Sequence, residues 1–178
     1  MVTPIIETDR ILLRPMKVQD AEMVFNNWAT DPDVTKFLRW NTHQSIDTTI
    51  DWLRYEENNV ENEKSYQWNF VHKDNNDIFG SGGLSYDEHR KMFELGYAIM
   101  KKYWNQGLTT EIVKAIVRYA ITDLCMANLF ARTAIEHIAS QRVLEKSGFV
   151  FHSNGKYSSF DEKRVFKCKV YVYNANSH

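Results

Sequence analysis

The sequence predicts a mixed α/β fold, in which one sheet carries helices packed against it. Two periodic patterns and their order along the chain support this prediction. Apolar residues at every second position mark strands, and apolar residues three and four apart mark helices. Strands come first, followed by strand, helix, strand, helix and strand, which is typical of a mixed sheet covered by helices. No repeat or linker divides the chain, so we expect one domain over residues 1–178.

The first third of the chain is predicted to form one strand and two helices. Residues 10–16 form the strand, and Pro15 places it at a sheet edge or at a strand end. The stripe of the first helix, which ends at residues 31–33, consists of Ala21, Val24, Phe25 and Trp28. A second helix begins with Ser45 as its N-cap and gives way to a solvated loop over residues 56–64. Its buried side consists of Ile46, Ile50 and Leu53.

The middle of the chain is predicted to be a meander of three strands. The first strand has aromatic residues at every second position, which we assign to the core: Tyr66, Trp68 and Phe70. An Asx-type turn at residues 74–77 leads to the second strand, over residues 78–85. Its glycines indicate bends or close backbone approach: Gly80, Gly82 and Gly83. The third strand covers residues 93–100.

The last third is predicted to alternate between helix and strand. A long helix follows Gly107, with Leu108, Ile112, Ala115, Ile116 and Tyr119 on its apolar side. A strand over residues 129–134 precedes a short helix over residues 140–146, which Gly148 stops. A strand at residues 149–152 and a final strand over residues 166–172, with one wet face, complete the sheet.

Composition excludes several classes of protein. The chain has 22 Lys and Arg against 23 Asp and Glu, and this net charge of −1 argues against bulk-charge binding to nucleic acid or membrane. No apolar run approaches the roughly 18 residues of a transmembrane helix, and the first residues lack a signal-peptide pattern. Cys125 and Cys168 lie far apart, so we expect a reduced, cytoplasmic protein.

The titratable side chains predict neither a metal site nor a hydrolytic triad. The six histidines lack the i, i+4 pairing of a zinc-binding helix, and no Cys-x-x-Cys is present. A G-x-S-x-G nucleophile elbow is also missing.

The segment from Phe93 to Ala120 is the most informative for chemistry. A strand that runs through a short glycine-containing loop into a helix leaves several backbone N–H groups unpaired at the positive end of that helix. This arrangement suits a phosphate or pyrophosphate. The loop, N-Q-G-L-T-T at residues 105–110, is neither a Walker A motif nor a G-x-G-x-x-G fingerprint, so an ordinary helix start with a threonine cap remains open.

Four segments, in this order, carry a resemblance to a known family. They are I-E-T-D-R-I-L-L-R-P at residues 6–15, E-L-G-Y-A-I at 94–99, Y-W-N-Q-G-L-T-T-E at 103–111 and I-A-S-Q-R-V-L-E-K-S-G-F at 138–149. The sequence resembles the GNAT superfamily of N-acetyltransferases, in the branch of the RimJ/RimL-type ribosomal-protein N-terminal acetyltransferases. The resemblance implies an acyl-CoA N-acyltransferase fold, with a central, mostly antiparallel sheet flanked by helices.

The resemblance also implies acetyl-CoA as donor, with direct attack of an amine on the thioester and no acyl-enzyme. The pyrophosphate is then expected at the N–H groups of residues 106–110, and the pantetheine arm beside residues 99–101. A backbone N–H near Ile99 is expected to bind the oxyanion. The cofactor-binding residues are Ile99, Met100, Lys101, Asn105, Gln106, Gly107, Leu108, Thr109, Thr110, His137 and Ser140.

Three positions depart from the family pattern. Asn105 stands where this branch commonly has glycine, and Thr109 occupies the last small position of the loop. The side chains of both must point away from the phosphates. His137 stands where the family often has asparagine, and an imidazole still donates one hydrogen bond.

Two residues are the candidates for proton transfer. Ser140 matches the serine that this branch is expected to use to protonate the leaving thiolate, although a role as N-cap of the short helix is also open. Glu94, on the strand that lines the family's cleft, is the candidate base, acting through water, and its alternative is a solvated carboxylate.

The acceptor is predicted to be a primary amine, with a protein N-terminus ahead of a small metabolite. An α-amine has a pKa of about 7.7–8.0, against about 10.4 for lysine, so it needs only a modest base. A small-molecule acceptor such as a polyamine, amino acid or aminoglycoside is one alternative, with an acidic pocket built from Glu56, Glu57, Glu61, Asp87 and Glu88. A non-catalytic acyl-CoA-binding regulator is the other. We expect a monomer or a homodimer.

Overall fold

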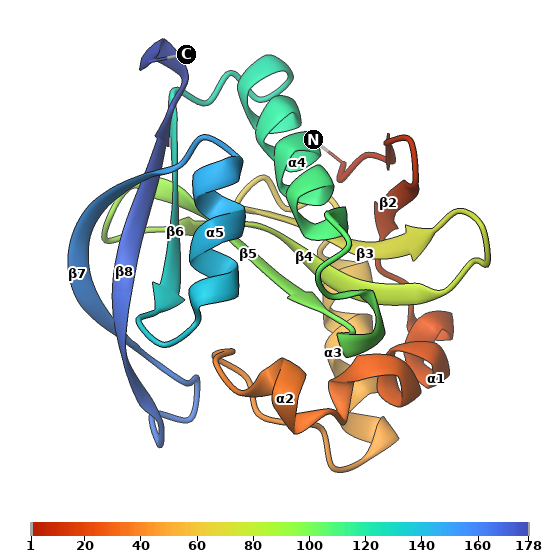
Figure 1. Cartoon of the computed structure of the whole chain (residues 1–178). Coiled ribbons are helices and arrows are strands. Elements are labelled where there is room, and N and C mark those ends of the chain that lie inside the picture. The colour runs from red at the N-terminus through yellow and green to blue at the C-terminus, as the bar shows by residue number, and fades with distance from the viewer. Residues whose placement is uncertain (1, 178) are drawn as a thin grey trace.

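The computed structural model describes residues 2–177, whose strands form one eight-stranded sheet in the order β1-β2-β3-β4-β5-β6-β8-β7 (Figure 1). The strands are β1 (Ile6–Glu7), β2 (Ile11–Pro15), β3 (Ser65–His72), β4 (Ile78–Asp87), β5 (Met92–Ile99), β6 (Asn128–Ala134), β7 (Val150–Ser158) and β8 (Val165–Asn174). Every neighbouring pair is antiparallel except β5 and β6, which run parallel. The predicted mixed, mostly antiparallel sheet is confirmed.

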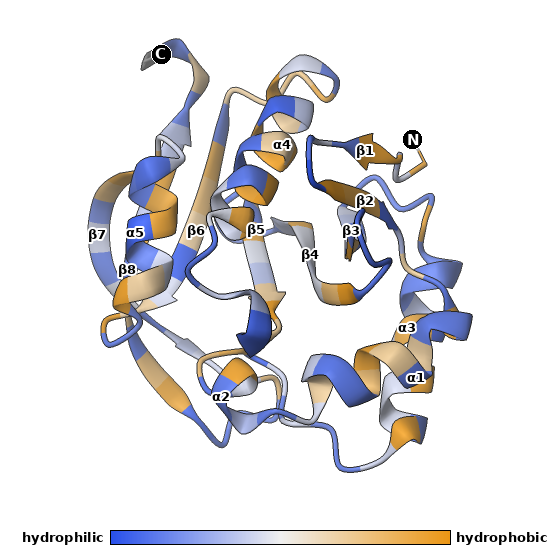
Figure 2. Ribbon diagram, turned by 45° about the vertical axis from the view of Figure 1, so that its right-hand side comes forward, coloured by the Kyte–Doolittle hydropathy of each residue, from blue (hydrophilic) through white to orange (hydrophobic). Residues whose placement is uncertain are grey.

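Helices cover both faces of this sheet. They are α1 (Ala21–Val24), α2 (Pro32–Thr35), α3 (Ile46–Asn58), α4 (Leu108–Thr122) and α5 (Ile138–Lys146). Helices α4 and α5 lie on one face, and α1, α2 and α3 lie on the other (Figure 1). Apolar and polar residues alternate around α4, as expected for a helix with one side on a sheet (Figure 2). Within residues 2–177, no helix has the length and the apolar character needed to cross a membrane.

Two short elements in the first third of the chain were not predicted. Strand β1 has only two residues, too few for a periodic pattern. The first helix ends at Ala29 with Thr30 as its C-cap, directly before the predicted residues 31–33. The same segment also starts α2, because the Asp31 side chain accepts from the Asp33 N–H (2.8 Å) and Pro32 occupies the first helical turn. The helix before it widens into a π-helical turn over Phe25–Ala29, which buries Trp28.

Helix α3 starts where the sequence predicts and ends later. The Ser45 side chain accepts from the Asp47 N–H (3.2 Å), so Ser45 is the N-cap. Leu53 is fully buried, whereas Ile46 and Ile50 are only partly buried. The helix continues to Asn58, so the expected loop over residues 56–64 is shorter than predicted.

Strand β4 packs unusually close to its neighbours. A Cβ atom on Gly83 would lie 1.9 Å from the Tyr66 carbonyl oxygen, and one on Gly82 would lie 2.3 Å from that of Gly96. The prediction of close backbone approach is therefore confirmed. The predicted aromatic core is also confirmed, since Tyr66, Trp68 and Phe70 are all buried.

The C-terminal elements are longer than predicted, and this changes one assignment. Helix α5 begins at Ile138 with His137 in the N-cap position, so Ser140 is its third residue and the N-cap alternative for Ser140 is wrong. Strand β7 extends to Ser158, well beyond the expected residue 152. The expected wet face of β8 is also wrong at Tyr171, which is buried beneath α5 and donates to Glu145 Oε1 (2.9 Å).

Candidate active site

The candidate site lies where β5 and β6 part. These parallel strands are paired only at Phe93 with Leu129 and at Glu94 with Phe130. The Met100 N–H donates to the Phe79 carbonyl of β4 (2.6 Å). Because successive N–H groups of a strand point to opposite edges, the Ile99 N–H points away from β4, into the opening. The strands therefore form a V-shaped opening with a backbone donor on one wall.

Gly96 forms an exposed part of this opening, on the face of β5 that also carries Glu94. It is exposed although β5 is an interior strand of the sheet, and an added Cβ would meet no atom within 4 Å. A molecule can therefore approach the β5 backbone from the face opposite α4.

The loop before α4 contains two residues with positive φ. Asn105 has φ 59° and Gly107 has φ 76°, both in the left-handed region. Asparagine is among the side chains that tolerate this region best, which explains how Asn105 replaces the family's glycine. Gly107 is the N-cap of the helix and makes no side-chain cap, so the alternative of a threonine cap is wrong. The backbone N–H groups of the first turn, including that of Leu108, lack intrahelical partners.

Other predicted cofactor contacts surround this loop. The Trp104 indole N–H donates to the Ile99 carbonyl (2.7 Å), and the Gln106 side chain donates to the Lys102 carbonyl (2.8 Å). The Lys101 ammonium pairs with Asp33 of α2. Thr109 and Thr110 lie in the first turn of α4, with side chains partly buried.

Arg10 lies beside this loop; it belongs to the segment at residues 6–15 that carries part of the resemblance, but the sequence assigned it no role in the site. It precedes β2, and its Nε donates to Glu111 Oε2 (2.7 Å) in the first turn of α4. Its Nη1 donates to the Gln106 carbonyl (3.0 Å). Glu111 also accepts from the Arg10 backbone N–H (3.1 Å). Burial opposes ionisation of Glu111, but hydrogen bonds from Thr8 and Arg10 outweigh it and lower the pKa of this carboxyl.

Ser140 shares a hydrogen bond with a tyrosine of the opposite wall. The Ser140 Oγ lies 2.9 Å from the Tyr97 Oη, so α5 and β5 meet at two hydroxyl groups. Burial raises the pKa of Tyr97 to about 12, although the hydrogen bond to Ser140 acts in the other direction. The Tyr97 phenol therefore stays protonated at neutral pH.

His137 faces a loop on the other side of the opening. Its ring stacks on Phe37, which follows α2, with centroids 4.9 Å apart. Burial, with a smaller effect of Lys36, lowers the pKa of His137, so the imidazole is neutral at pH 7. The buried Gln141 side chain holds the same end of α5, because it donates to the Ile135 carbonyl (2.8 Å) and accepts from Lys169 (2.9 Å).

Glu94 is bound to Arg132 of β6 at the apex of the opening. Arg132 Nε and Nη2 donate to its two carboxylate oxygens at 2.7 and 2.5 Å. Both side chains are largely buried, at 15% exposure for Arg132 and 21% for Glu94. This bidentate pair joins β5 to β6 where the backbone pairing stops. A carboxylate has about four lone-pair sites, so Glu94 can still accept from a water.

The loop over residues 36–41 closes one end of the opening by binding the turn between β7 and β8. The Arg164 guanidinium donates to three carbonyls of this loop, at 3.0–3.3 Å: Lys36, Leu38 and Trp40. The Tyr157 hydroxyl donates to the Phe37 carbonyl (2.7 Å). These contacts place the 36–41 loop and the β7–β8 hairpin at the same end of the opening.

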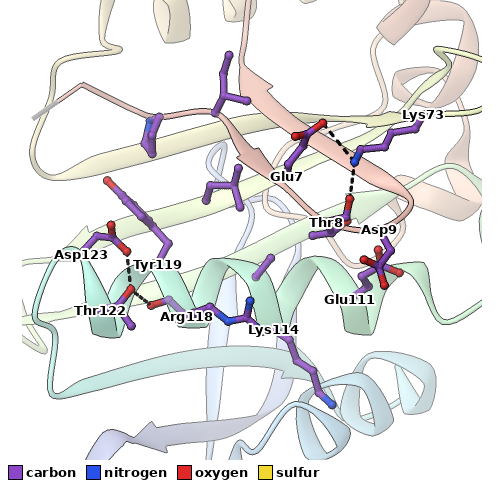
Figure 3. Close-up of a pocket in the computed structure, with 14 residues that line it drawn as sticks. Glu7, Thr8, Asp9, Lys73, Glu111, Lys114, Arg118, Tyr119, Thr122 and Asp123 are labelled. Carbon is purple, nitrogen blue, oxygen red and sulfur yellow. Dashed lines mark hydrogen bonds and ion pairs between the residues drawn. The ribbon is translucent and has the colours of Figure 1, made fainter.

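Two grooves lie outside the opening. One, of about 740 Å³, runs between the N-terminal segment and α4, with Lys114 and Arg118 on its helical side (Figure 3). The other, of about 330 Å³, lies at the 36–41 loop beside Phe160. None of the five acidic residues of the small-molecule alternative lines either groove. Glu56, for example, accepts from the Trp52 indole (3.2 Å), and burial raises its pKa. Over residues 2–177, no cluster of His, Cys, Asp or Glu is placed to hold a metal ion.

The fold and the match of a family model assign this chain to a class of proteins. A family model for the acetyltransferase (GNAT) domain matches residues 10–150, and the chain belongs to this family. It is an acetyl-CoA-dependent N-acetyltransferase.

One relative and two solved structures show how this chain compares with known acetyltransferases. The relative YoaA of Bacillus subtilis (strain 168), named as an uncharacterized N-acetyltransferase, is 29% identical over 148 residues, or 82% of each chain. The structure of RimL, the ribosomal L7/L12 α-N-protein acetyltransferase in complex with coenzyme A, has a TM-score of 0.82 at 13% identity, covering 98% of this chain and 100% of that one. The ribosomal-protein-S5-alanine acetyltransferase of Vibrio fischeri has a TM-score of 0.75 at 17% identity, covering 96% of both chains.

Proposed function

We propose that this enzyme acetylates the N-terminal α-amine of a protein or peptide. The observation that carries the proposal is the bidentate contact of Arg132 with Glu94. Because both oxygens of Glu94 accept from the guanidinium, this carboxylate can reach an amine only through a water bound at its remaining lone pairs. Deprotonating an α-amine near pH 7 costs about 1 kcal/mol, whereas a lysine side chain costs nearly 5 kcal/mol. A carboxylate that acts only through a water suffices for the α-amine and not for the lysine side chain.

Each reacting part has a proposed partner in the opening. The N–H groups of residues 106–110 hold the pyrophosphate, and the backbone of residues 99–101 holds the pantetheine arm. The Ile99 N–H donates to the oxyanion that forms when the amine attacks the thioester carbonyl. Ser140 gives its proton to the leaving thiolate, and Glu94 takes one from the amine through water. The amine adds directly, with no acyl-enzyme.

The related proteins support this choice of acceptor. RimL acts on the α-amine of ribosomal L7/L12, and the Vibrio fischeri enzyme acts on an alanine of ribosomal protein S5. Both share the fold of this chain, with TM-scores of 0.82 and 0.75. The proposed compartment is the cytoplasm, since Cys125 and Cys168 are both free thiols, as is usual in a reducing environment.

A competition assay tests the acceptor. Short peptides with free Ala or Ser N-termini are offered with acetyl-CoA, beside the same peptides blocked at the N-terminus but carrying lysine, and beside a polyamine. We expect thiol release and acetylation with the free N-termini only. Transfer to the polyamine alone would place the enzyme among small-molecule acetyltransferases. Modification of the blocked, lysine-bearing peptides would overturn the argument from Glu94, and no turnover with any amine would favour a regulator.

A further inference from the structure

Arg10 connects the first long strand of the sheet to the loop before α4, across 96 to 101 residues of sequence. Its guanidinium donates to the Gln106 carbonyl at 3.0 Å and to Glu111 at 2.7 Å. A Cβ atom built on Gly107 would lie 3.7 Å from Arg10 Nη2. The guanidinium therefore lies beside the loop proposed to hold the pyrophosphate.

The contact with Gln106 determines where the next N–H points. The peptide bond between Gln106 and Gly107 is trans, so the Gln106 carbonyl and the Gly107 N–H point in opposite directions. Arg10 directly precedes β2, and β2 and α5 lie on opposite sides of α4 (Figures 1 and 2). The Gly107 N–H consequently points away from the Arg10 guanidinium.

This peptide plane needs to be held, because its alternative orientation is accessible. Gly107, with φ 76° and ψ −2°, has the conformation of the third residue of a type II turn. Rotating the central peptide by half a turn converts type II into type I, and the carbonyl and the N–H exchange sides. Glycine adopts both conformations readily. In the rotated form, the Gln106 carbonyl would face the phosphates and repel them.

We propose that Arg10 is a positioning residue for acetyl-CoA, which selects the orientation of the Gln106–Gly107 peptide that presents the Gly107 N–H to the pyrophosphate. Glu111 holds Arg10 in place, because its Oε2 accepts from the guanidinium and its Oε1 accepts from the Arg10 backbone N–H. The inference rests on the proposed placement of the pyrophosphate at this loop. It assigns to the segment at residues 6–15, which carries part of the family resemblance, a role in binding the donor.

Calorimetry with CoA tests the inference on three variants. Arg10→Gln should raise the Kd for CoA about ten-fold, the loss expected for one hydrogen bond to a charged group. Arg10→Lys should restore binding only in part, because one ammonium cannot reproduce the planar fork that reaches both Gln106 and Glu111. The matched control is Arg14→Gln, which removes the bidentate pair of Arg14, on β2, with Asp20. It should keep the Kd within two-fold, although it destabilises the fold.

A second measurement separates positioning from a general structural effect. The chain has seven glycines, so the Gly107 amide can be assigned in a nitrogen–proton NMR spectrum. CoA should move the Gly107 amide proton strongly downfield in the wild type and less than half as far in Arg10→Gln at saturation. When an amine that the enzyme acetylates is supplied, Arg10→Gln should raise the KM for acetyl-CoA and leave kcat within two-fold.

Three outcomes would count against the inference. A wild-type Kd in Arg10→Gln would overturn it, and so would an unchanged Gly107 shift in the saturated variant. An equal loss in Arg14→Gln would show a general effect of stability. If the wild type and Arg10→Gln bind CoA equally well, the inference fails and the proposed function stands. If the wild type does not bind CoA, the inference and the proposed function both fail.

Discussion

At the scale of single residues, the two hydroxyls that meet across the opening support the proposed proton transfer from Ser140. The Tyr97 phenol stays protonated, since burial raises its pKa to about 12, so it can donate to the Ser140 Oγ 2.9 Å away. The Ser140 proton is then free to point at the thiolate. Ser140 also lies in the first turn of α5, where the helix dipole stabilises negative charge that develops nearby.

Replacing Ser140 by alanine should therefore slow chemistry without weakening donor binding. We expect Ser140→Ala to lower turnover about 10²–10³-fold and to leave the Kd for CoA within a few-fold. Tyr97→Phe, which keeps the ring and removes the donor, should lower turnover about ten-fold. Thiol release and calorimetry measure the two quantities. Unchanged turnover in Ser140→Ala would reduce Ser140 to a structural contact.

Glu94 should show its role in the pH dependence of the reaction. Glu94→Gln keeps a carbonyl oxygen for Arg132 but cannot accept a proton at neutral pH. We expect the ascending limb of the pH–rate profile to disappear and the maximal rate to fall about 10²-fold. If the limb stays in place, the free amine comes from solution and Glu94 only joins β5 to β6.

At the scale of elements, the glycines of β4 let three strands approach closely, so that β5 is in place to present its backbone to the opening. Gly83→Ala should lower the free energy of unfolding by about 2–3 kcal/mol, because its Cβ would lie 1.9 Å from the Tyr66 carbonyl oxygen. Gly96→Ala on the adjacent strand is the matched control, since its Cβ would meet nothing within 4 Å. Urea denaturation compares them, and equal stabilities would contradict the close packing of β3 against β4.

At the scale of the whole molecule, loops distant in sequence close the mouth of the site. The 36–41 loop binds the β7–β8 turn through Arg164, and its far end leads to His43, which is buried beside Trp40 and Trp52. His43 Nδ1 lies 2.7 Å from the Thr49 hydroxyl of α3. The burial of His43 lowers its pKa from the ordinary value of 6.5.

From the lowered pKa of His43, we predict that the free energy of unfolding decreases in mild acid. Since the pKa of His43 is lower in the folded state, the unfolded chain binds the proton more tightly. Stability is complete above about pH 6.5 and falls as the pH drops toward the folded pKa, by up to about 1.4 kcal/mol per pH unit. His43→Gln should reduce this slope, whereas replacement of the exposed His89 should not. Denaturation series between pH 7.5 and 4.5 measure it, and identical slopes in all three proteins would refute the assignment.

The sequence by itself determined the sheet, the order of its main elements, the family and the glycine-containing loop that leads into α4. These features depend on local periodicity and on contiguous motifs such as residues 138–149, which short stretches of chain encode. The start of α3 at Ser45 is also encoded locally, because an N-cap side chain contacts only the backbone two or three residues further along the chain.

Only the tertiary structure decided which side chains meet across the opening. Arg10 and Gln106, Glu94 and Arg132, and Tyr97 and Ser140 lie 38 to 96 residues apart, and no local pattern links them. Strand β1 and helix α2 are too short to produce a periodic signal, and the burial of Tyr171 depends on where α5 lies. Long-range contacts depend on how the strands pair, and β5 presents its edge to the opening because it stops pairing with β6 after Glu94.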